Sequence, residues 1–340
     1  PGGTTSVSST APLSAYFQVT NRARFELRGP DAIRYLNGQV SIDITRLSPA
    51  KARPACLLTA KGQLCAPLQI WRQGDSLIIE GPPELCENIQ ARLERYIIAD
   101  DVELLPLPAL EPLYHILPFP HWLQNHPALP PGDAPEKGAQ ASRLCCHSPS
   151  TSPTSSHATR PLEGDAPSAP LSPPHLTISR LNLPGYDASD KPTHLPELPH
   201  AAIELLRIVS GVPIWGRELT EDTLPQEARL EDHAVDFDKG CYVGQETVSR
   251  LKSVGRVNKR LHGFLSSSDF PAGVPLFLRP PGDPSTTAGQ ITSRARDFDM
   301  AQTAALGYLN RQFESLPRFE VADETGRVLG EVERRDFPIL

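Results

Sequence analysis

The chain has 340 residues, of which 39% are hydrophobic and 37 are proline, so it is long enough for two or three modules with real cores. Its formal net charge of −7 disfavours nonspecific nucleic-acid binding, which needs clustered lysine and arginine, and we expect no direct nucleic-acid partner. No apolar run reaches the roughly 18 residues of a membrane span, and residues 1–13 lack a basic segment followed by an apolar one, so we expect no signal peptide, no membrane contact and a cytoplasmic location.

Residues 14–120 have the pattern of a module that mixes α and β structure. Two prolines open the segment 82–98, in which Leu85, Ile89 and Leu93 recur on one face, and this spacing predicts a helix. Apolar alternation and turn residues predict strands around it. These strands are expected at 23–29, 75–81 and 102–105, with two more on either side of a turn at Lys61-Gly62.

The composition changes after residue 120. Residues 121–175 are rich in Pro, Ser, Thr, Gly and Ala and have few large apolar side chains. Such a stretch cannot bury enough surface to offset its ordering entropy, so we predict a disordered insertion. Residues 176–256 are expected to form a central module with a helix that stops at Gly211. The many short strands of 257–340 predict a small antiparallel barrel.

Six cysteines are present, and no two of them form a C-x-x-C pair. Scattered cysteines in a cytosolic protein are usually reduced core residues, which is the expectation for Cys56, Cys65 and Cys86. The adjacent Cys145-Cys146 pair falls in the predicted insertion, where we regard it as incidental. The remaining Cys241 has no second cysteine or histidine at ligand spacing, so we predict no metal site.

The segment D-K-G-C-Y-V-G-Q-E at residues 238–246 gathers reactive groups around Cys241. Two glycines bracket the cysteine and allow a sharp turn that a ligand can approach. Lys239 lies close to the thiol in the sequence, and a nearby ammonium favours a thiolate. His233 is either a partner of Cys241 in space or a solvated side chain. The residues alone leave two interpretations open: a reactive thiol, or a glycine-rich turn around a buried cysteine.

The run K-G-C-Y-V-G-Q-E at 239–246 resembles the signature of the YgfZ family, relatives of the glycine-cleavage T protein (aminomethyltransferase). The resemblance continues through segments at 28–44, 57–71, 207–230 and 306–311. It implies an α+β fold, a three-module ring of aminomethyltransferase-like architecture with a C-terminal antiparallel β-barrel. It also implies a central hole for a tetrahydrofolate-type ligand, and support of iron–sulfur cluster assembly or repair in client enzymes, including radical enzymes that modify tRNA.

The same resemblance indicates which residues carry the function. The essential cysteine of the signature falls on Cys241, and we predict Cys241 and Lys239 as the catalytic residues. The predicted folate-binding residues surround them: Asn37, Gln39, Gly240, Tyr242, Gly244, Gln245, Glu246 and Arg250. For Asn37 and Gln39, capping of the preceding helix is an equal alternative. For Arg250, the alternatives are a solvated side chain and a contact with an anionic folate tail.

Two departures from the family pattern affect the expected chemistry. The aminomethyltransferase branch has an acidic residue in the hairpin, whereas residues 63–68 contain none, so folate-dependent one-carbon transfer is only the alternative function. Val209 stands where many relatives have a glutamate that is expected to hold pterin N–H groups, with Glu204 or Glu227 as substitutes. A third hypothesis is a non-catalytic, folate-binding regulator of tRNA modification.

Overall fold

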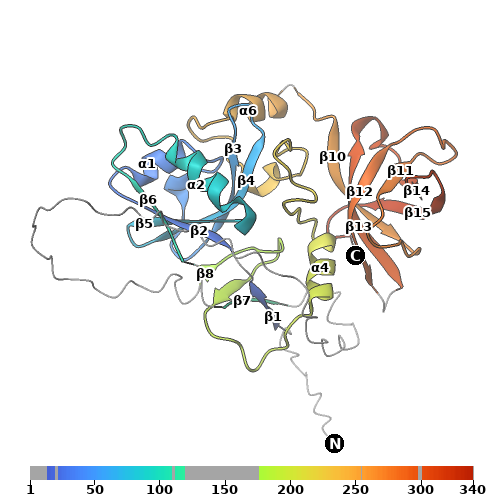
Figure 1. Ribbon diagram of the computed structural model, residues 1–340, viewed down its shortest axis with the longest axis horizontal. Helices are drawn as coiled ribbons and strands as arrows, with labels where there is room; N and C mark the ends of the chain where they lie inside the picture. The colour runs from blue at the N-terminus through green and yellow to red at the C-terminus, as the bar shows by residue number, and fades with distance from the viewer. Residues whose placement is uncertain are drawn as a thin grey trace, which may run out of the picture.

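The computed structural model describes residues 14–19, 22–108, 112–118, 176–253, 255–297 and 301–339. The insertion predicted at 121–175, with Cys145 and Cys146, lies outside these residues. Three sheets organise the described chain: one of five strands, one of four strands and a closed barrel of six (Figure 1). The predicted α+β class with a C-terminal barrel is confirmed, while the predicted boundaries of the four segments stay predictions.

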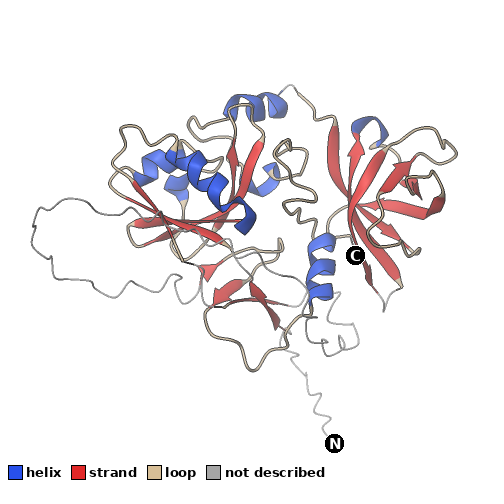
Figure 2. Cartoon of the chain, in the orientation of Figure 1, coloured by secondary structure: helices blue, strands red, loops and turns tan. Residues whose placement is uncertain are grey.

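The five-stranded sheet is antiparallel and carries two helices on one face (Figure 2). Its strands, in spatial order, are β3 (Arg53–Leu58), β4 (Leu64–Gln73), β5 (Ser76–Gly81), β2 (Ala23–Arg28) and β6 (Glu103–Pro106). The helices are α1 (Ala32–Asn37) and α2 (Cys86–Glu94), with short 3-10 turns η1 (Ile44–Arg46) and η2 (Pro83–Leu85). Leu85, Ile89 and Leu93 are buried under this face as predicted, because their spacing places them on one side of the η2–α2 segment.

The four-stranded sheet takes strands from both sides of the predicted insertion. Its order is β1 (Ser14–Val19), β7 (Leu113–Pro118), β9 (Tyr186–Ala188) and β8 (Leu176–Thr177). A parallel bridge between Lys51 and Thr177 joins it to the five-stranded sheet. The first strand of the chain therefore shares a sheet with residues more than a hundred positions later.

The barrel closes in the order β10 (Lys259–Ser266), β13 (Gln302–Asn310), β12 (Gly289–Asp297), β11 (Leu276–Arg279), β14 (Arg318–Ala322) and β15 (Val328–Arg335), with the 3-10 turn η3 (Arg311–Phe313) after β13. Phe264 and Phe319 are buried in its interior and meet edge to face, with ring centroids 6.2 Å apart. Closure leaves no unpaired sheet edge, as a small antiparallel barrel requires.

Three helices lie between the sheets and the barrel. They are α4 (His200–Val209), α5 (Glu231–Ala234) and α6 (Gln245–Ser253). Helix α4 lies against the barrel (Figure 1) and packs on it through Ile208 and Val209, while α5 contacts β3. Within the described part of the chain, no helix has the length and apolar character needed to cross a bilayer.

Candidate functional site

The segment that carries the signature runs from α5 to α6 and is anchored to the N-terminal module. The backbone N–H of Asp236 donates to Ser41 O at 2.9 Å, and that of Val243 donates to Gly38 O at 3.1 Å. The Asp236 carboxylate accepts a bidentate pair from Arg53 at 2.8 and 2.9 Å. We call residues 236–244 the signature loop; both of its ends are therefore fixed by contacts that are distant in sequence.

Cys241 is a free, exposed cysteine on this loop. The interpretation in which a glycine-rich turn surrounds a buried cysteine is therefore wrong. Cys56 is fully buried, and burial raises the pKa of its thiol to about 12. Cys65 is half-buried, and burial raises its pKa as well. Cys86 is also partly buried, so Cys241 is the most exposed of the described cysteines.

Lys239 points away from solvent and is only 7% exposed. Its Nζ donates to three backbone carbonyls, those of Asn37 at 2.6 Å and of Val40 and Ile42 at 2.7 Å. The ammonium also lies 5.0 Å from the centroid of the Tyr242 ring. Burial lowers the pKa of Lys239 to about 8, although Asp43 and Asp236 oppose that shift. The structure thus gives Lys239 a full set of backbone acceptors, and its predicted action on the thiol stays a prediction.

The end of the signature loop packs on the turn between β3 and β4. Gly244 has a φ of +88°, and a Cβ at this position would lie 2.5 Å from the carbonyl oxygen of Thr59. Gly62 in the turn has a φ of +80°, and its Cβ would lie 2.8 Å from Thr247 Cβ. Two glycines thus allow the hairpin turn and the start of α6 to touch. Gly240 differs, because a Cβ there would meet open space.

The other predicted binding residues have mixed surroundings. Asn37 Oδ1 accepts from the backbone N–H of Ile44 at 2.9 Å, and Gln39 Oε1 accepts from Arg92 Nη1 at 3.1 Å. Tyr242 is buried beside Cys56, and burial raises the pKa of its phenol. The remaining three lie at the start of or along α6: Gln245 is partly buried, while Glu246 and Arg250 are exposed.

Residues that sequence reasoning missed hold this region together. Ser41 Oγ accepts from the backbone N–H of Cys56 at 2.7 Å and donates to Ala234 O, so it joins β3 to α5. Arg92 on α2 donates to Leu58 O at 2.9 Å as well as to Gln39. These contacts join residues that are far apart in sequence and follow no local spacing rule, so no motif could have indicated them.

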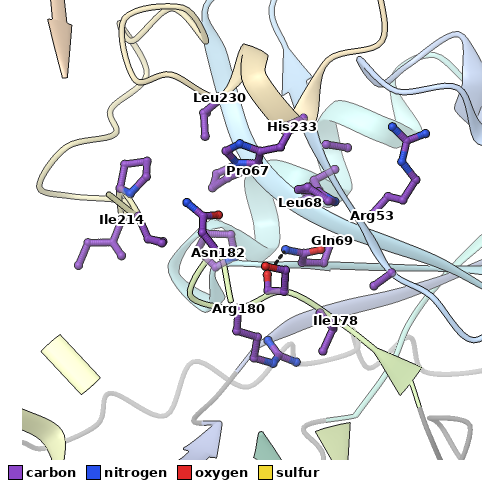
Figure 3. A pocket seen from close by; sticks show the side chains of 18 of the residues that line it. Arg53, Pro67, Leu68, Gln69, Ile178, Arg180, Asn182, Ile214, Leu230 and His233 are labelled. Atoms are coloured by element: carbon purple, nitrogen blue, oxygen red, sulfur yellow. Dashed lines mark hydrogen bonds between the residues drawn. The ribbon is translucent and has the colours of Figure 1, made fainter. Parts of the chain in front are cut away.

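A cavity of about 880 Å³ lies beside the loop, where the five-stranded sheet, the segment after β8 and the segment after α4 meet (Figure 3). Its walls are mainly apolar and include Pro67, Leu68, Ile178, Ile214 and Leu230, with His233 and Arg180 also facing it. Gln69 donates through Nε2 to Ser179 O at 3.2 Å, while its buried Oε1 lacks a partner among the described residues. This volume and lining are typical of a small-molecule site.

The cavity and the signature loop are neighbours but do not share the predicted binding residues. None of the eight predicted folate-binding residues, nor Cys241, belongs to the lining of this cavity. The residues of the β3–β4 hairpin that line the cavity lie at the end away from its turn. Ala55 in the lining and Thr59 at the turn are about 13 Å apart along an extended strand. Arg53 connects the two regions, because it lines the cavity and also holds Asp236 at the base of the loop. His233 lines the cavity too, so the structure brings it to this space and not to the exposed thiol.

Comparison with known proteins shows what the chain is similar to. No family model matches the chain. It is 26% identical over 337 residues to the tRNA-modifying protein YgfZ of Photorhabdus laumondii, covering 95% of this chain and 92% of that protein. It is 25% identical over 269 residues to the mitochondrial iron-sulfur cluster assembly factor IBA57 homolog of Chaetomium globosum, covering 72% of this chain. Over most of its length the chain resembles the YgfZ and IBA57 proteins.

The fold of the chain matches that of a solved aminomethyltransferase. The glycine cleavage system aminomethyltransferase T from Bartonella henselae superposes with a TM-score of 0.67 at 15% identity, covering 97% of this chain and 87% of that one. The expected aminomethyltransferase-like architecture is confirmed by this match. The chain spans about half the length of the Chaetomium relative, 54% of it.

Val209, at the position where the resemblance expects a glutamate, does not line the cavity. Val209 is fully buried against the barrel, with Leu261 and Leu306, and its carbonyl accepts from Ile339 N at 3.0 Å. The two substitute acids are also engaged elsewhere. Glu204 pairs with Arg207 and Arg217, and Glu227 accepts from the backbone of Leu224. The described cavity lining includes one carboxylate, that of Glu84.

A cluster of buried charged side chains lies next to the cavity. Glu80 is fully buried and pairs with Arg22 at 3.1 Å, Arg24 at 2.7 Å and Arg180 at 2.8 Å. Burial alone would raise the pKa of Glu80, but the three guanidinium groups outweigh it and hold the pKa well below its usual range. Arg180 also pairs with Asp187 on β9, so the cluster joins the five-stranded sheet to the four-stranded sheet.

Proposed function

We propose that this chain supports the assembly or repair of iron–sulfur clusters in client enzymes, and that Cys241 is the residue through which it acts. Similar proteins are named as an iron-sulfur cluster assembly factor and as a tRNA-modifying protein. In this chain, the exposed thiol on the signature loop is the observation that supports the proposal. Thiolates are the usual protein ligands of iron–sulfur clusters, so a thiol is the chemical group suited to contact such a substrate.

The exposure of Cys241 favours a macromolecular client. The thiol lies on a surface loop outside the lining of the large cavity, and its neighbour Gly240 adds no side chain that would shield it. A partner protein can therefore approach the sulfur without entering the cavity. We infer that the loop is the contact point for the client, and that the cavity serves a separate small molecule.

Replacement of Cys241 by serine tests this function. We expect Cys241→Ser to abolish rescue of a strain that lacks its own family member, because the sulfur is removed and little else changes. An exposed loop substitution of this kind changes the free energy of unfolding by less than about 0.5 kcal/mol, so the variant stays folded. Cys65→Ser is the matched control, because Cys65 is a half-buried cysteine on β4. We expect this variant to keep rescue. Full rescue by Cys241→Ser would refute the proposal.

The cavity is the site we assign to a tetrahydrofolate-type ligand. Its size and apolar walls suit a planar ring system, and the buried, unpartnered Oε1 of Gln69 can accept from a ring N–H once the side chain turns towards the cavity. Lys51 and Arg22 in the lining would attract the carboxylates of a folate tail. When bound, this ligand supplies a carrier for one-carbon groups. The residues of the chain would hold and orient it, with Gln69 in place of the family carboxylate.

Ligand binding can be measured directly by titration calorimetry with tetrahydrofolate under anaerobic conditions. We expect Gln69→Leu to weaken binding about tenfold, the loss of about one hydrogen bond worth 1.4 kcal/mol. Gln90→Leu serves as the control, since Gln90 lies on α2 and bonds to Glu94 outside the cavity. Equal affinity of the Gln69→Leu variant and the parent would exclude Gln69 from the binding site.

A further inference from the structure

Three carbonyl oxygens from one short segment converge on a single cation. They belong to Asn37, the last residue of helix α1, and to Val40 and Ile42 just beyond it, and they surround Nζ of Lys239 at 2.6 to 2.7 Å. Carbonyls at the end of a helix have no partner within that helix and need an outside donor. An ammonium has three N–H donors, and three well-placed acceptors use all of them.

We propose that Lys239 is a positioning residue, which holds the signature loop in the conformation that presents Cys241, and that it does so through this cage of carbonyls and not through a contact with the thiol. This inference rests on the proposed function of Cys241. It assigns the two signature residues different tasks: one carries the chemistry and the other fixes the loop.

The remaining contacts of the loop show why one side chain can have this effect. The backbone is attached at Asp236 N and at Val243 N, and Asp238, Gly240 and Cys241 are exposed between these points. Within this span, the buried side chains of Lys239 and Tyr242 face the N-terminal module. Loss of the ammonium would leave three buried carbonyls without their donor and the middle of the loop without its central attachment.

The competing explanation is that Lys239 supplies only positive charge to the region of the thiol. Arginine separates the two, because it keeps the charge but presents a planar fork of donors that cannot converge on three carbonyls around one point. Positioning predicts that Lys239→Arg disturbs the loop almost as much as Lys239→Met. A pure charge effect predicts that Lys239→Arg behaves like the parent.

Hydrogen exchange measured by mass spectrometry on peptides that span residues 236–244 reports the loop directly. We expect exchange there to be at least about ten times faster in Lys239→Met and in Lys239→Arg, with barrel peptides unchanged. Rescue of the strain that lacks its own family member should fall in both variants. Parental exchange in either variant, or full rescue by Lys239→Arg, would overturn the proposal.

Chemical rescue provides a second measurement that does not depend on the fit of a new side chain. Lys239→Ala leaves room for propylammonium, which carries the same three donors as the missing group. Propylammonium should slow loop exchange in this variant towards the parental rate, whereas propyltrimethylammonium, which has no N–H donor, should not. Equal effects of the two ions, or no effect of propylammonium, would contradict the carbonyl cage. Because exchange is measured without any client, this result stands even if Cys241→Ser shows the proposed function to be wrong.

Discussion

Replacing Glu80 by glutamine is expected to lower the free energy of unfolding by about 3 to 5 kcal/mol at pH 7. The carboxylate is fully buried and pairs with three arginines, and two of these, Arg24 and Arg180, are themselves almost fully shielded from solvent. A neutral amide has nearly the same shape but leaves buried positive charge without its partner. Because the cluster also joins two sheets, the loss affects the whole molecule and not a local region.

The pH dependence of this effect has a definite sign. The folded-state pKa of Glu80 lies below its ordinary value of 4.5. Its stabilising contribution is therefore complete above about pH 4.5 and is lost as the pH falls through the folded pKa. The parent should lose stability on acidification, and Glu80→Gln should show a shallower fall over the same range.

Urea unfolding at pH 7 and at several lower pH values measures both effects. Glu103→Gln is the control, because Glu103 also pairs with an arginine, Arg28 at 2.7 Å, but on the exposed surface. Surface pairs contribute little, so this variant should lie within about 0.5 kcal/mol of the parent. Similar losses in the two variants would show that the buried cluster has no special weight.

Replacing Gly244 by alanine should destabilise the molecule by about 2 kcal/mol or more and should also abolish rescue. A left-handed backbone costs a non-glycine residue about 1 to 2 kcal/mol. The new Cβ would in addition lie 2.5 Å from a backbone oxygen, Thr59 O, which cannot move without opening the β3–β4 turn. The loop would have to leave the hairpin, and Cys241 would lose its position.

Gly240→Ala is the matched control within the same signature. Nothing lies within 4 Å of its Cβ position, and its φ is not in the left-handed range. We expect its free energy of unfolding to stay within about 0.5 kcal/mol of the parent. Thermal unfolding of the two purified variants makes the comparison. A larger loss for Gly240→Ala than for Gly244→Ala would mean that the packing of the loop on the hairpin is not what stabilises it.

Features that depend on local spacing could be predicted from the sequence. The face of Leu85, Ile89 and Leu93, the short strands of the barrel and the turn at Lys61-Gly62 all follow from periodicity or turn chemistry. Each of these signals lies within a few residues of chain, where a single pattern is enough.

Features that depend on contacts between segments far apart in the sequence could not be predicted. Strand β9 has three residues, which is too short for any alternation to be visible. Closeness in sequence predicts that Lys239 lies near the thiol, but it gives no sign of the backbone carbonyls that accept from its ammonium, which lie about two hundred residues earlier. The resemblance expects a ligand-holding glutamate at the position of Val209, whereas the apolar side of α4 turns this residue towards the barrel. In each case tertiary packing decided the outcome.

The four-stranded sheet takes strands from both sides of the predicted insertion, which affects how freely that insertion can change during evolution. Ile116, just before the predicted insertion, and Thr177, just after it, are both register partners of Tyr186, on opposite sides of β9. Two strand spacings separate them, about 10 Å. Any peptide that spans this short gap closes the sheet, so relatives can lengthen, shorten or recode the stretch without moving the cavity or the exposed thiol.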